Sequence, residues 1–410
     1  MQETAAFCRN TMNQHIENLY ALAQKPSRLI IGLMSGTSMD GLDVALCNIE
    51  GAGTNTNLSV LQFETVPFTD NIKKEIRDVF SKKNVDLEKL TLLNPWIALQ
   101  HARMVNNCLK KWKLAAEDID LIASHGQTIY HAPKTLHGRP KFGNATLQIG
   151  DGDHLAVATG IITISDFRQK HIAAGGEGAP LAVYGDYILF GKKGENRILL
   201  NIGGIANFTY LPADMDTAKI FSTDTGPGNT MMDAFMRKHF NRRYDKQGAV
   251  AASGKINDKL LAALKKNAFF KRPFPKTTGP ELFSLDYLAK AQSVSGTNRI
   301  AKKDVMATLN KFSADSICDA VNRTVRRDEQ VTIYTSGGGI HNPVLQQHII
   351  DQLPDCRFAS TAELEINPDA KEAVLFALLA NECVSGDVST WGKGAKGMPA
   401  VSMGKISFPG

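Results

Sequence analysis

Hydroxyl, glycine and carboxylate groups gather in one short stretch, Ser35-Gly36-Thr37-Ser38-Met39-Asp40-Gly41. Glycines let a backbone turn tightly and approach a ligand, hydroxyls donate hydrogen bonds, and Asp40 can hold a metal ion or its water shell. These groups suit the phosphate end of a nucleoside triphosphate. Their composition alone leaves an ordinary polar hairpin equally open.

The same chemistry returns in the second half of the chain. Residues 198–208 (ILLNIGGIANF) are typical of a strand, a glycine turn and a second strand, and residues 224–229 (DTGPGN) are predicted to form a further polar loop. A glycine-bearing turn between two strands in both halves of the chain indicates an internal repeat. The repetition favours the phosphate-binding interpretation of residues 35–41 over a plain hairpin.

Asp166 is the candidate catalytic base. It follows a short apolar strand, precedes Arg168, and is soon followed by the glycine-rich stretch 174–180. A carboxylate at a strand end, with a cation beside it and a flexible loop behind it, can take a proton from an attacking nucleophile. A helix cap or a loop ion pair would explain the same residue.

Two further loops are candidates for ligand contact. His125 and Gln127 follow a predicted buried strand over residues 119–123, at the sheet edge where ligands bind in open α/β sheets. A histidine bonded to a backbone carbonyl is the alternative. Gly337, Gly338 and Gly339 follow a predicted strand at 331–334 and could cradle the adenosine or its first phosphate.

Strands and helices that would position these residues alternate along the whole chain. Apolar runs predict strands at 28–34 and 42–49, a third antiparallel strand at 59–67, and further strands at 146–149 and 161–164. A long helix is predicted at 87–112. In the second half we expect helices from about residue 180, near 228 and from about 342, with a closing helix at 369–379.

The N-terminal segment differs from the rest. Met12, Ile16, Leu19 and Ala23 recur at helical spacing before Pro26, which predicts an amphipathic helix packed on the body. We therefore divide the chain into an N-terminal helical extension (1–27), a first lobe (28–165 plus 370–410) and a second lobe (166–369). The expected architecture is two α/β lobes around a central cleft.

Composition excludes several classes of protein. With 410 residues, 43% hydrophobic and 21% charged, the chain is typical of a soluble protein of two domains. The net charge of +6 is spread over scattered basic pairs, which gives no support for a nucleic acid partner. Six cysteines without a CxxC pair indicate reduced thiols and a cytoplasmic location, and no apolar run is long enough to predict a membrane span.

The two hairpins resemble the actin-like ATPase and sugar kinase superfamily, whose paired lobes clamp ATP between phosphate hairpins. Nine stretches, in order, resemble the bacterial anhydro-N-acetylmuramic acid kinases more closely: IGLMSGTSMDGLDVAL, SHGQTIYH, TLQIGDGDHLA, SDFRQKHIAAGGEGAPL, LNIGGIANFT, DTGPGN, KTTGPELF, SGGGIHNP and NPDAKEAVLFALLA. The resemblance covers nearly all of the chain from residue 28. It implies an α/β, two-lobed actin-like ATPase (ribonuclease H-like) fold with a central ATP and sugar cleft.

The activity implied by the resemblance belongs to cell-wall recycling. Such an enzyme takes 1,6-anhydro-N-acetylmuramic acid, ATP and water and forms N-acetylmuramic acid 6-phosphate and ADP. A bridged sugar has no free hydroxyl at the position to be phosphorylated, so a base must activate water for attack at the anomeric carbon. A homodimer is also implied. The small-molecule partners are the anhydro sugar, ATP and water, without nucleic acid or membrane.

The resemblance also assigns residues. Asp166 matches the catalytic base, and Mg²⁺ is expected to arrive with ATP, near Asp40 or Asp224, without a protein-only cage. The expected sugar-facing residues are His125, Gln127, Arg168 and Glu281. The expected ATP-binding residues are Gly36, Thr37, Ser38, Met39, Asp40, Gly41, Leu42, Asp43, Gly203, Gly204, Asn207, Asp224, Gly226 and Gly338.

One departure from the family pattern leaves the identity of the sugar substrate undecided. Pro280 stands in TTGPELF where a basic residue is expected, and a lost cation would alter contact with the lactyl carboxylate or the amide of the substrate. A kinase of another anhydro sugar, such as levoglucosan, is therefore the first alternative. The second is an actin-like ATP-binding module that phosphorylates nothing.

Overall fold

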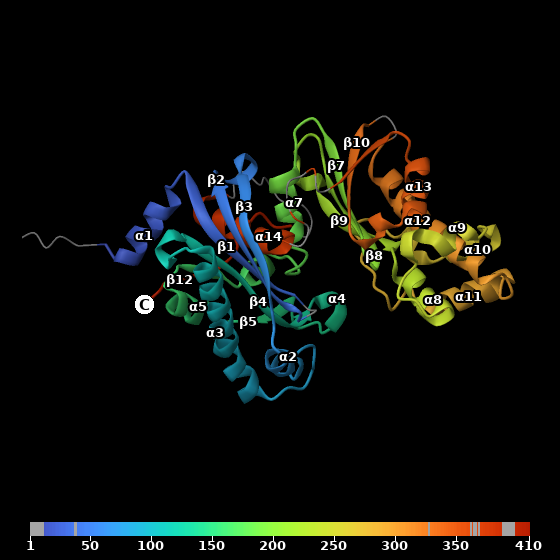
Figure 1. Ribbon diagram of the computed structural model, residues 1–410. Coiled ribbons are helices and arrows are strands. Elements are labelled where there is room, and N and C mark those ends of the chain that lie inside the picture. Colours follow the sequence, from blue (N-terminus) through green and yellow to red (C-terminus); the bar gives the residue numbers. More distant parts are fainter. Residues whose placement is uncertain are drawn as a thin grey trace, which may run out of the picture. The chain divides into compact units, whose positions relative to one another are not determined.

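Each half of the chain is built on one β-sheet in this computed structural model, which describes residues 12–36, 39–326, 329–360, 363, 367, 370–387 and 398–410 (Figure 1). The chain divides into two units, Met1–Leu189 with Asp369–Gly410, and Phe190–Pro368. No helix of the described residues is both long enough and apolar enough to cross a lipid bilayer.

The first unit contains a seven-stranded sheet in the order β12-β6-β4-β1-β2-β3, with β5 paired to β4. Its elements are α1 (Gln14–Ala23), β1 (Ser27–Ser35), β2 (Gly41–Glu50), β3 (Asn57–Pro67), α2 (Asp70–Arg77), α3 (Leu87–Trp112), β4 (Leu121–Ala132), α4 (Lys134–His137), β5 (Ala145–Ile149), α5 (Gly152–Thr159), β6 (Thr163–Ser165), α6 (Phe167–Ala173), α7 (Ala182–Phe190), α14 (Lys371–Ser385) and β12 (Lys405–Ser407).

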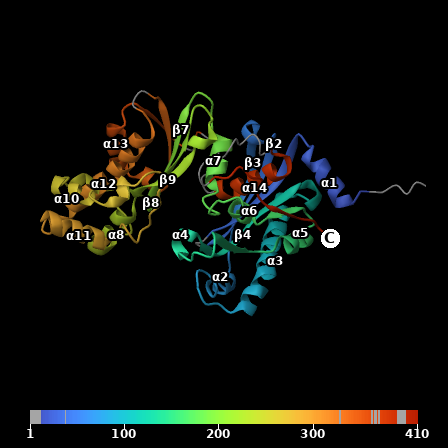
Figure 2. The ribbon, with the colours of Figure 1, turned by 180° about the vertical axis from the view of Figure 1, so that it is seen from behind.

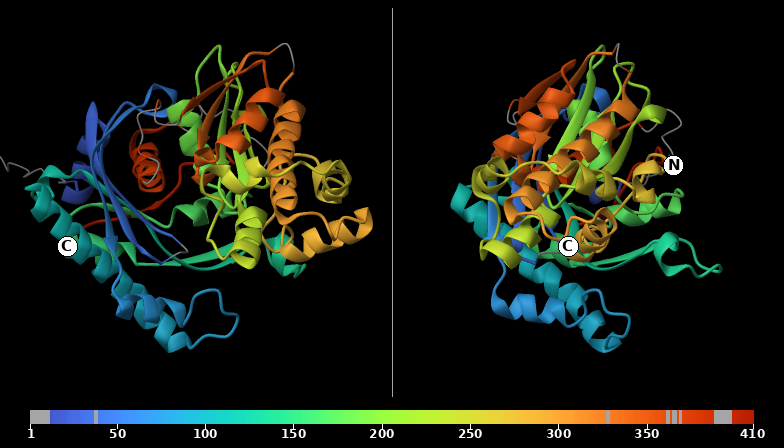
Figure 3. Two further views of the ribbon diagram at one scale, coloured as in Figure 1. Left: turned by 45° about the vertical axis from the view of Figure 1, so that its right-hand side comes forward. Right: turned by 90° about the vertical axis from the view of Figure 1, so that its right-hand side faces the viewer.

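The predicted meander is confirmed. β1 pairs antiparallel with β2, and β2 pairs antiparallel with β3. Side chains alternate between the two faces of a strand, so Ile31 and Leu33 of β1 point into the core beneath α3. Gly32 points to the other face, where α14 packs on β1, β2 and β4 (Figure 3).

Helix α3 begins and ends where the periodicity of the sequence predicts. The side chain of Asp86 accepts a hydrogen bond from the Lys89 amide at the N-terminus, and Lys113 ends the helix in the left-handed conformation (φ 60°). The buried face includes Leu93, Ile97 and Val105, whereas Leu99 is 38% exposed.

The helix predicted before Pro26 forms as α1, but its apolar face is not the one that we expected. Leu22 is buried, whereas Met12 and Ile16 are 62% and 46% exposed. Residues 1–11 of the predicted extension lie outside the described residues.

The second unit contains a five-stranded sheet in the order β11-β10-β7-β8-β9. Its elements are β7 (Asn196–Ile202), β8 (Ile205–Leu211), β9 (Phe221–Pro227), α8 (Thr230–Phe240), α9 (Ala249–Ser253), α10 (Asp258–Leu264), α11 (Leu285–Ser295), α12 (Lys302–Thr324), β10 (Val331–Ser336), α13 (Pro343–Gln352) and β11 (Cys356–Ser360). A buried apolar core joins the inward side chains of β7, β8 and β10 to those of α8, α10, α12 and α13.

The two sheets repeat one topology, as the duplicated motifs predict. In each unit, three antiparallel strands form a meander, the first of them pairs in parallel with a later strand, and that strand pairs in parallel with another. This order, 3-2-1-4-5 within each unit, is that of the ribonuclease H-like fold. The predicted α/β fold class is therefore correct.

Two predicted loops are strands instead. Residues 124–128 lie within β4, because they pair with β1 on one side and β5 on the other. Residues 224–227 lie within β9, because they pair with β8. In both cases the residues are polar or glycine, so they lack the apolar pattern by which a strand is predicted, and pairing with neighbouring strands makes them extended.

The imidazole of His101 predicts a pH dependence of stability. His101 is buried on α3 beside Phe68, with a ring centroid distance of 6.1 Å, and burial lowers its pKa from 6.5 to about 4. The unfolded chain binds this proton below about pH 6.5 and the folded protein only below about pH 4. The free energy of unfolding should therefore fall as the pH drops through this window, by roughly 3 kcal/mol.

Urea unfolding followed by tryptophan fluorescence tests this expectation, since Trp96 and Trp112 lie on the same helix. His101→Phe should make the dependence shallower by up to about 1.4 kcal/mol per pH unit between pH 4 and 6.5. An unchanged slope would contradict the assignment of His101 as a buried neutral imidazole.

Candidate functional site

The first predicted phosphate hairpin joins β1 to β2, and Thr37 and Ser38 at its centre lie outside the described residues. The side chains of Met39 and Leu42 are buried in the core beneath α3, so only their backbone groups can face a ligand. Met39 adopts a left-handed conformation (φ 58°). These two predicted ATP-binding residues thus anchor the turn through apolar burial.

The carboxylates of this hairpin are placed differently from one another. Asp40 is exposed, and its carbonyl accepts a hydrogen bond from the Phe68 amide. Asp43 accepts a hydrogen bond of 2.6 Å from the Thr65 hydroxyl. A Cβ at Gly41 would lie 2.4 Å from the Val66 carbonyl oxygen, so the backbone of β3 already requires this glycine.

Asp166 follows β6 and holds a strained backbone. Its φ of 55° and ψ of 42° are left-handed, which costs a non-glycine residue about 1–2 kcal/mol. It precedes α6 but its side chain makes no capping hydrogen bond. The carboxylate instead meets the ammonium of Lys405 at 2.5 Å, which β12 delivers by pairing with β6. The capping alternative is therefore wrong, and an ion pair is present.

The partly buried Arg168 is bonded to the buried His125. The Nε of Arg168 donates to Nε2 of His125 at 2.9 Å, and its Nη1 donates to the Gly178 carbonyl at 2.6 Å. Burial and the Arg168 charge lower the pKa of His125 to about 3. His125 lies within β4 and is 3% exposed, which is a correction to its predicted place on a loop.

Gln127 lies on the same strand and is fully buried. Its Oε1 accepts a hydrogen bond of 2.5 Å from the Ser35 hydroxyl, and its Nε2 donates to the carbonyls of Gly36 and Thr128 at 3.4 and 3.2 Å. This residue, predicted to face a sugar, supports the first hairpin from behind.

Glu372 is a charged neighbour that the sequence did not single out. It lies in the first turn of α14, and burial raises its pKa, while Arg168 lowers it and Asp43 raises it further. Its carboxylate therefore lies within electrostatic reach of both the hairpin and Arg168. The family-like stretch NPDAKEAVLFALLA contains Glu372, but the motif does not tell which of its side chains points toward Arg168. Lys405 lies outside all nine family-like stretches, so the sequence did not indicate it.

The second predicted hairpin joins β7 to β8 (Figure 2). Gly203 and Gly204 are the two residues between these strands. Asn229, at the start of α8, closes it, because its backbone N–H and its Nδ2 both donate to the Gly203 carbonyl at 2.9 and 3.0 Å. A Cβ at Gly228 would lie 2.3 Å from the same carbonyl. Sequence inspection included Asn229 in a loop and missed this clamp.

The other predicted site residues of the second unit lie on β8, on β9 and in the segment before α11. Asn207 of β8 pairs in register with Asp224 of β9. Burial raises the pKa of Asp224, whose Oδ2 accepts a hydrogen bond of 2.7 Å from the Thr278 amide. Gly226 faces α12, where a Cβ would lie 3.0 Å from the Ser316 hydroxyl. Glu281 is exposed, with its carboxylate over the backbone of Gly279.

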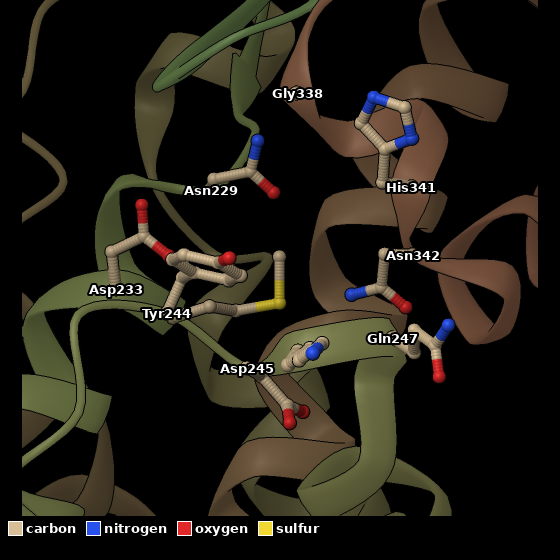
Figure 4. A pocket seen from close by; sticks show the side chains of 10 residues that line it. Asn229, Asp233, Tyr244, Asp245, Gln247, Gly338, His341 and Asn342 are labelled. Carbon is tan, nitrogen blue, oxygen red and sulfur yellow. The ribbon is translucent and has the colours of Figure 1, made fainter.

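A cavity of about 470 Å³ opens beside the second hairpin (Figure 4). Asn229 from the hairpin clamp and Gly338 after β10 both line it, and no neighbouring atom lies where a Cβ of Gly338 would stand. Tyr244, Gln247 and His341 supply an aromatic ring and polar groups. Volumes of this size hold nucleotides or drug-sized ligands.

The described residues contain no group of three or more His, Cys, Asp or Glu side chains that could hold a metal ion. Asp40 is an exposed carboxylate, and one oxygen of Asp224 is bonded to Thr278. Such a donor set fits Mg²⁺ held mostly by phosphate oxygens and water. It does not fit a metal held by the protein alone.

Comparison with known proteins agrees with these features. The family model described as "Anhydro-N-acetylmuramic acid kinase" matches residues 28–409. A protein of that name from Pseudoalteromonas atlantica is 60% identical over 400 residues, which cover 97% of this chain and 100% of the relative. One from Caldanaerobacter subterraneus is 38% identical over 396 residues, which cover 96% and 100%. This chain belongs to the anhydro-N-acetylmuramic acid kinase family.

Proposed function

We propose that this protein uses ATP and water to convert 1,6-anhydro-N-acetylmuramic acid to N-acetylmuramic acid 6-phosphate and ADP, in peptidoglycan recycling. Family membership over the whole chain supports the reaction. The observation that supports the assignment of residues is Asp166, whose carboxylate makes no capping hydrogen bond to its own helix, meets Lys405 through Oδ2, and lies two residues from Arg168. An ionised carboxylate that is not used as a helix cap can take a proton from a nucleophile.

Asp166 accepts the proton of a water molecule that attacks the anomeric carbon. The C1–O6 bond breaks, O6 attacks the γ-phosphorus in line, and the bond from the γ-phosphorus to the β–γ bridging oxygen breaks to release ADP. The proton on the carboxylate is returned to solvent after the step. Arg168 faces the anionic groups of the sugar, and Glu281 contacts its hydroxyls. In phosphoryl transfer, positioning and electrostatics supply most of the rate enhancement.

ATP binds through backbone and side-chain groups of both hairpins. The first supplies Gly36, Thr37, Ser38, Asp40, Gly41 and Asp43 with the backbone of Met39 and Leu42; the second supplies Gly203, Gly204, Asn207, Asp224 and Gly226. The adenosine occupies the cavity beside Gly338, which is supported by its volume and by Tyr244 in its wall. Asp40 or Asp224 would hold Mg²⁺, which would neutralise phosphate charge.

Two further proposals concern assembly and location. The protein is a homodimer, which rests on family likeness alone. It works in the cytoplasm, where the thiols that are free in this structure would stay reduced: Cys47, Cys108, Cys318, Cys356 and Cys383.

Replacement of the base gives the first test. Asp166→Asn keeps the size of the side chain but cannot take a proton, so turnover should fall by roughly a hundred- to ten-thousand-fold. Calorimetry should still detect binding of ATP and of the anhydro sugar. Asp153→Asn, an exposed carboxylate on α5, is the matched control and should leave ADP release unchanged. Near-normal turnover by Asp166→Asn would remove this residue from the reaction.

Heavy-oxygen water gives the second test, through mass analysis of the product. Attack of water at C1 places the label on the anomeric carbon and none in the phosphate. N-acetylmuramic acid 6-phosphate kept in the same water for the same time corrects for exchange at C1. Label in the phosphate group instead would mean that water attacks phosphorus, and the proposed reaction would be wrong.

Substrate comparison separates the alternatives left by Pro280. ADP release should have a much higher kcat/KM with 1,6-anhydro-N-acetylmuramic acid than with levoglucosan, which lacks the lactyl and acetamido groups. The opposite order would favour a levoglucosan-type kinase. ATP hydrolysis that does not depend on either sugar would favour a non-catalytic actin-like module.

A further inference from the structure

His125 and Gln127 lie on the same strand, but His125 bonds to Arg168 and Gln127 bonds to the first hairpin. They are 3% and 0% exposed, so neither side chain presents appreciable surface to a sugar. The polar atoms of both side chains nevertheless make hydrogen bonds to other residues of the protein. A buried polar group with all of its hydrogen bonds made within the protein holds those partners in place.

The tautomer of His125 follows from its partners. The guanidinium Nε–H of Arg168 can only donate, so Nε2 of His125 must accept this hydrogen bond of 2.9 Å. The proton is therefore on Nδ1, which donates to the Gly126 carbonyl at 2.8 Å. The ring also packs on Phe376 of α14, with a centroid distance of 4.8 Å. His125 is thus a neutral acceptor in a fixed orientation.

This acceptor sets the orientation of Arg168. Two hydrogen bonds, from Nε to His125 and from Nη1 to the Gly178 carbonyl, fix the plane of the guanidinium. Among the described residues, none accepts a hydrogen bond from Nη2. We therefore assign Nη2 as the group of Arg168 that bonds to a ligand.

Gln127 performs the corresponding task for the first hairpin. Its amide bonds to Ser35 and Gly36, the last two residues before Thr37. Gly126 separates the two side chains with φ 73°, and the β1–β4 register shifts at this point because β4 carries an extra residue. Such a bulge re-aims neighbouring side chains. Here it lets one side chain reach Arg168 and the next reach the turn.

We infer that His125 and Gln127 are positioning residues, His125 for the arginine that faces the sugar and Gln127 for the turn that holds the phosphates of ATP. Neither contacts the substrate or carries a proton in the reaction. The inference rests on the proposed function and replaces direct sugar contact by these two side chains with an indirect role.

Steady-state kinetics tests the inference through two separate Michaelis constants. His125→Phe keeps an aromatic ring against Phe376 but removes the acceptor, so the KM for the anhydro sugar should rise roughly tenfold or more, with the KM for ATP within about twofold of the wild type. Gln127→Leu should do the reverse, with a rise of about three- to thirtyfold in the KM for ATP.

Two paired variants show whether the effect comes from the hydrogen bond to Arg168 or from packing. His125→Gln can extend an oxygen toward Nε of Arg168 and should recover most of the sugar affinity. His125→Asn is too short and should not, and it takes the place of His125→Phe if that variant does not fold. His15→Phe, on α1 and stacked on Phe408, is the matched control and should leave both constants unchanged.

The outcomes separate the inference from the function that it rests on. A wild-type protein that releases no ADP in response to the anhydro sugar overturns the proposed function. An active wild type with variants that raise both constants together, or neither, overturns the positioning roles. Equal kinetics for His125→Gln and His125→Asn would also overturn the role of the Nε2 acceptor.

Discussion

The close approach of α14 to β1 is the contact on which the first unit depends. A Cβ at Gly32 would lie 1.9 Å from the Ala373 carbonyl oxygen, so any side chain there would push the helix away from the sheet. The helix places Glu372 near Arg168, and Phe376 against both His125 and Phe167, at 4.8 and 5.3 Å between ring centroids. One glycine thus allows residues more than 200 positions apart to form one site.

Buried charges hold this helix at both ends. At its start, Lys371 pairs with the buried Asp186 of α7 at 2.7 Å. Near its end, the buried guanidinium of Arg28 donates to Asn381 Oδ1 at 2.7 Å and to the Gly51 carbonyl at 2.9 Å. Burial lowers the pKa of Arg28 and raises that of Glu382, so both charges are costly unless bonded. Loss of a hydrogen-bond partner of Arg28 or Glu382 would leave a buried charge unbonded and would therefore destabilise the packing of α14.

Sequence reasoning succeeded where the determining pattern is local. The periodicity of residues 87–112 and the apolar runs of β1 and β2 predict their elements because each is specified by its own side chains. It failed for residues 124–128 and 224–227, whose strand character comes from pairing with other strands and not from their own polar and glycine residues. Motifs located the stretches that form the candidate site but not the direction of side chains. Met39 and Leu42 lie in the core, Gly41 and Gly226 avoid clashes with neighbouring elements, and Lys405 arrives from the last strand.

The repeated topology carries different residues at the same strand position in the two units. In the first, β4 runs in parallel beside β1, and Gln127 fills the space behind the hairpin. In the second, β10 runs in parallel beside β7 but ends in glycines, and a Cβ at Gly337 would lie 2.6 Å from the Asn201 side chain. The hairpin there is closed from another direction, by Asn229. The same strand position therefore carries a supporting side chain in one unit and leaves room for a ligand beside Gly338 in the other, which gives two copies of one fold different tasks.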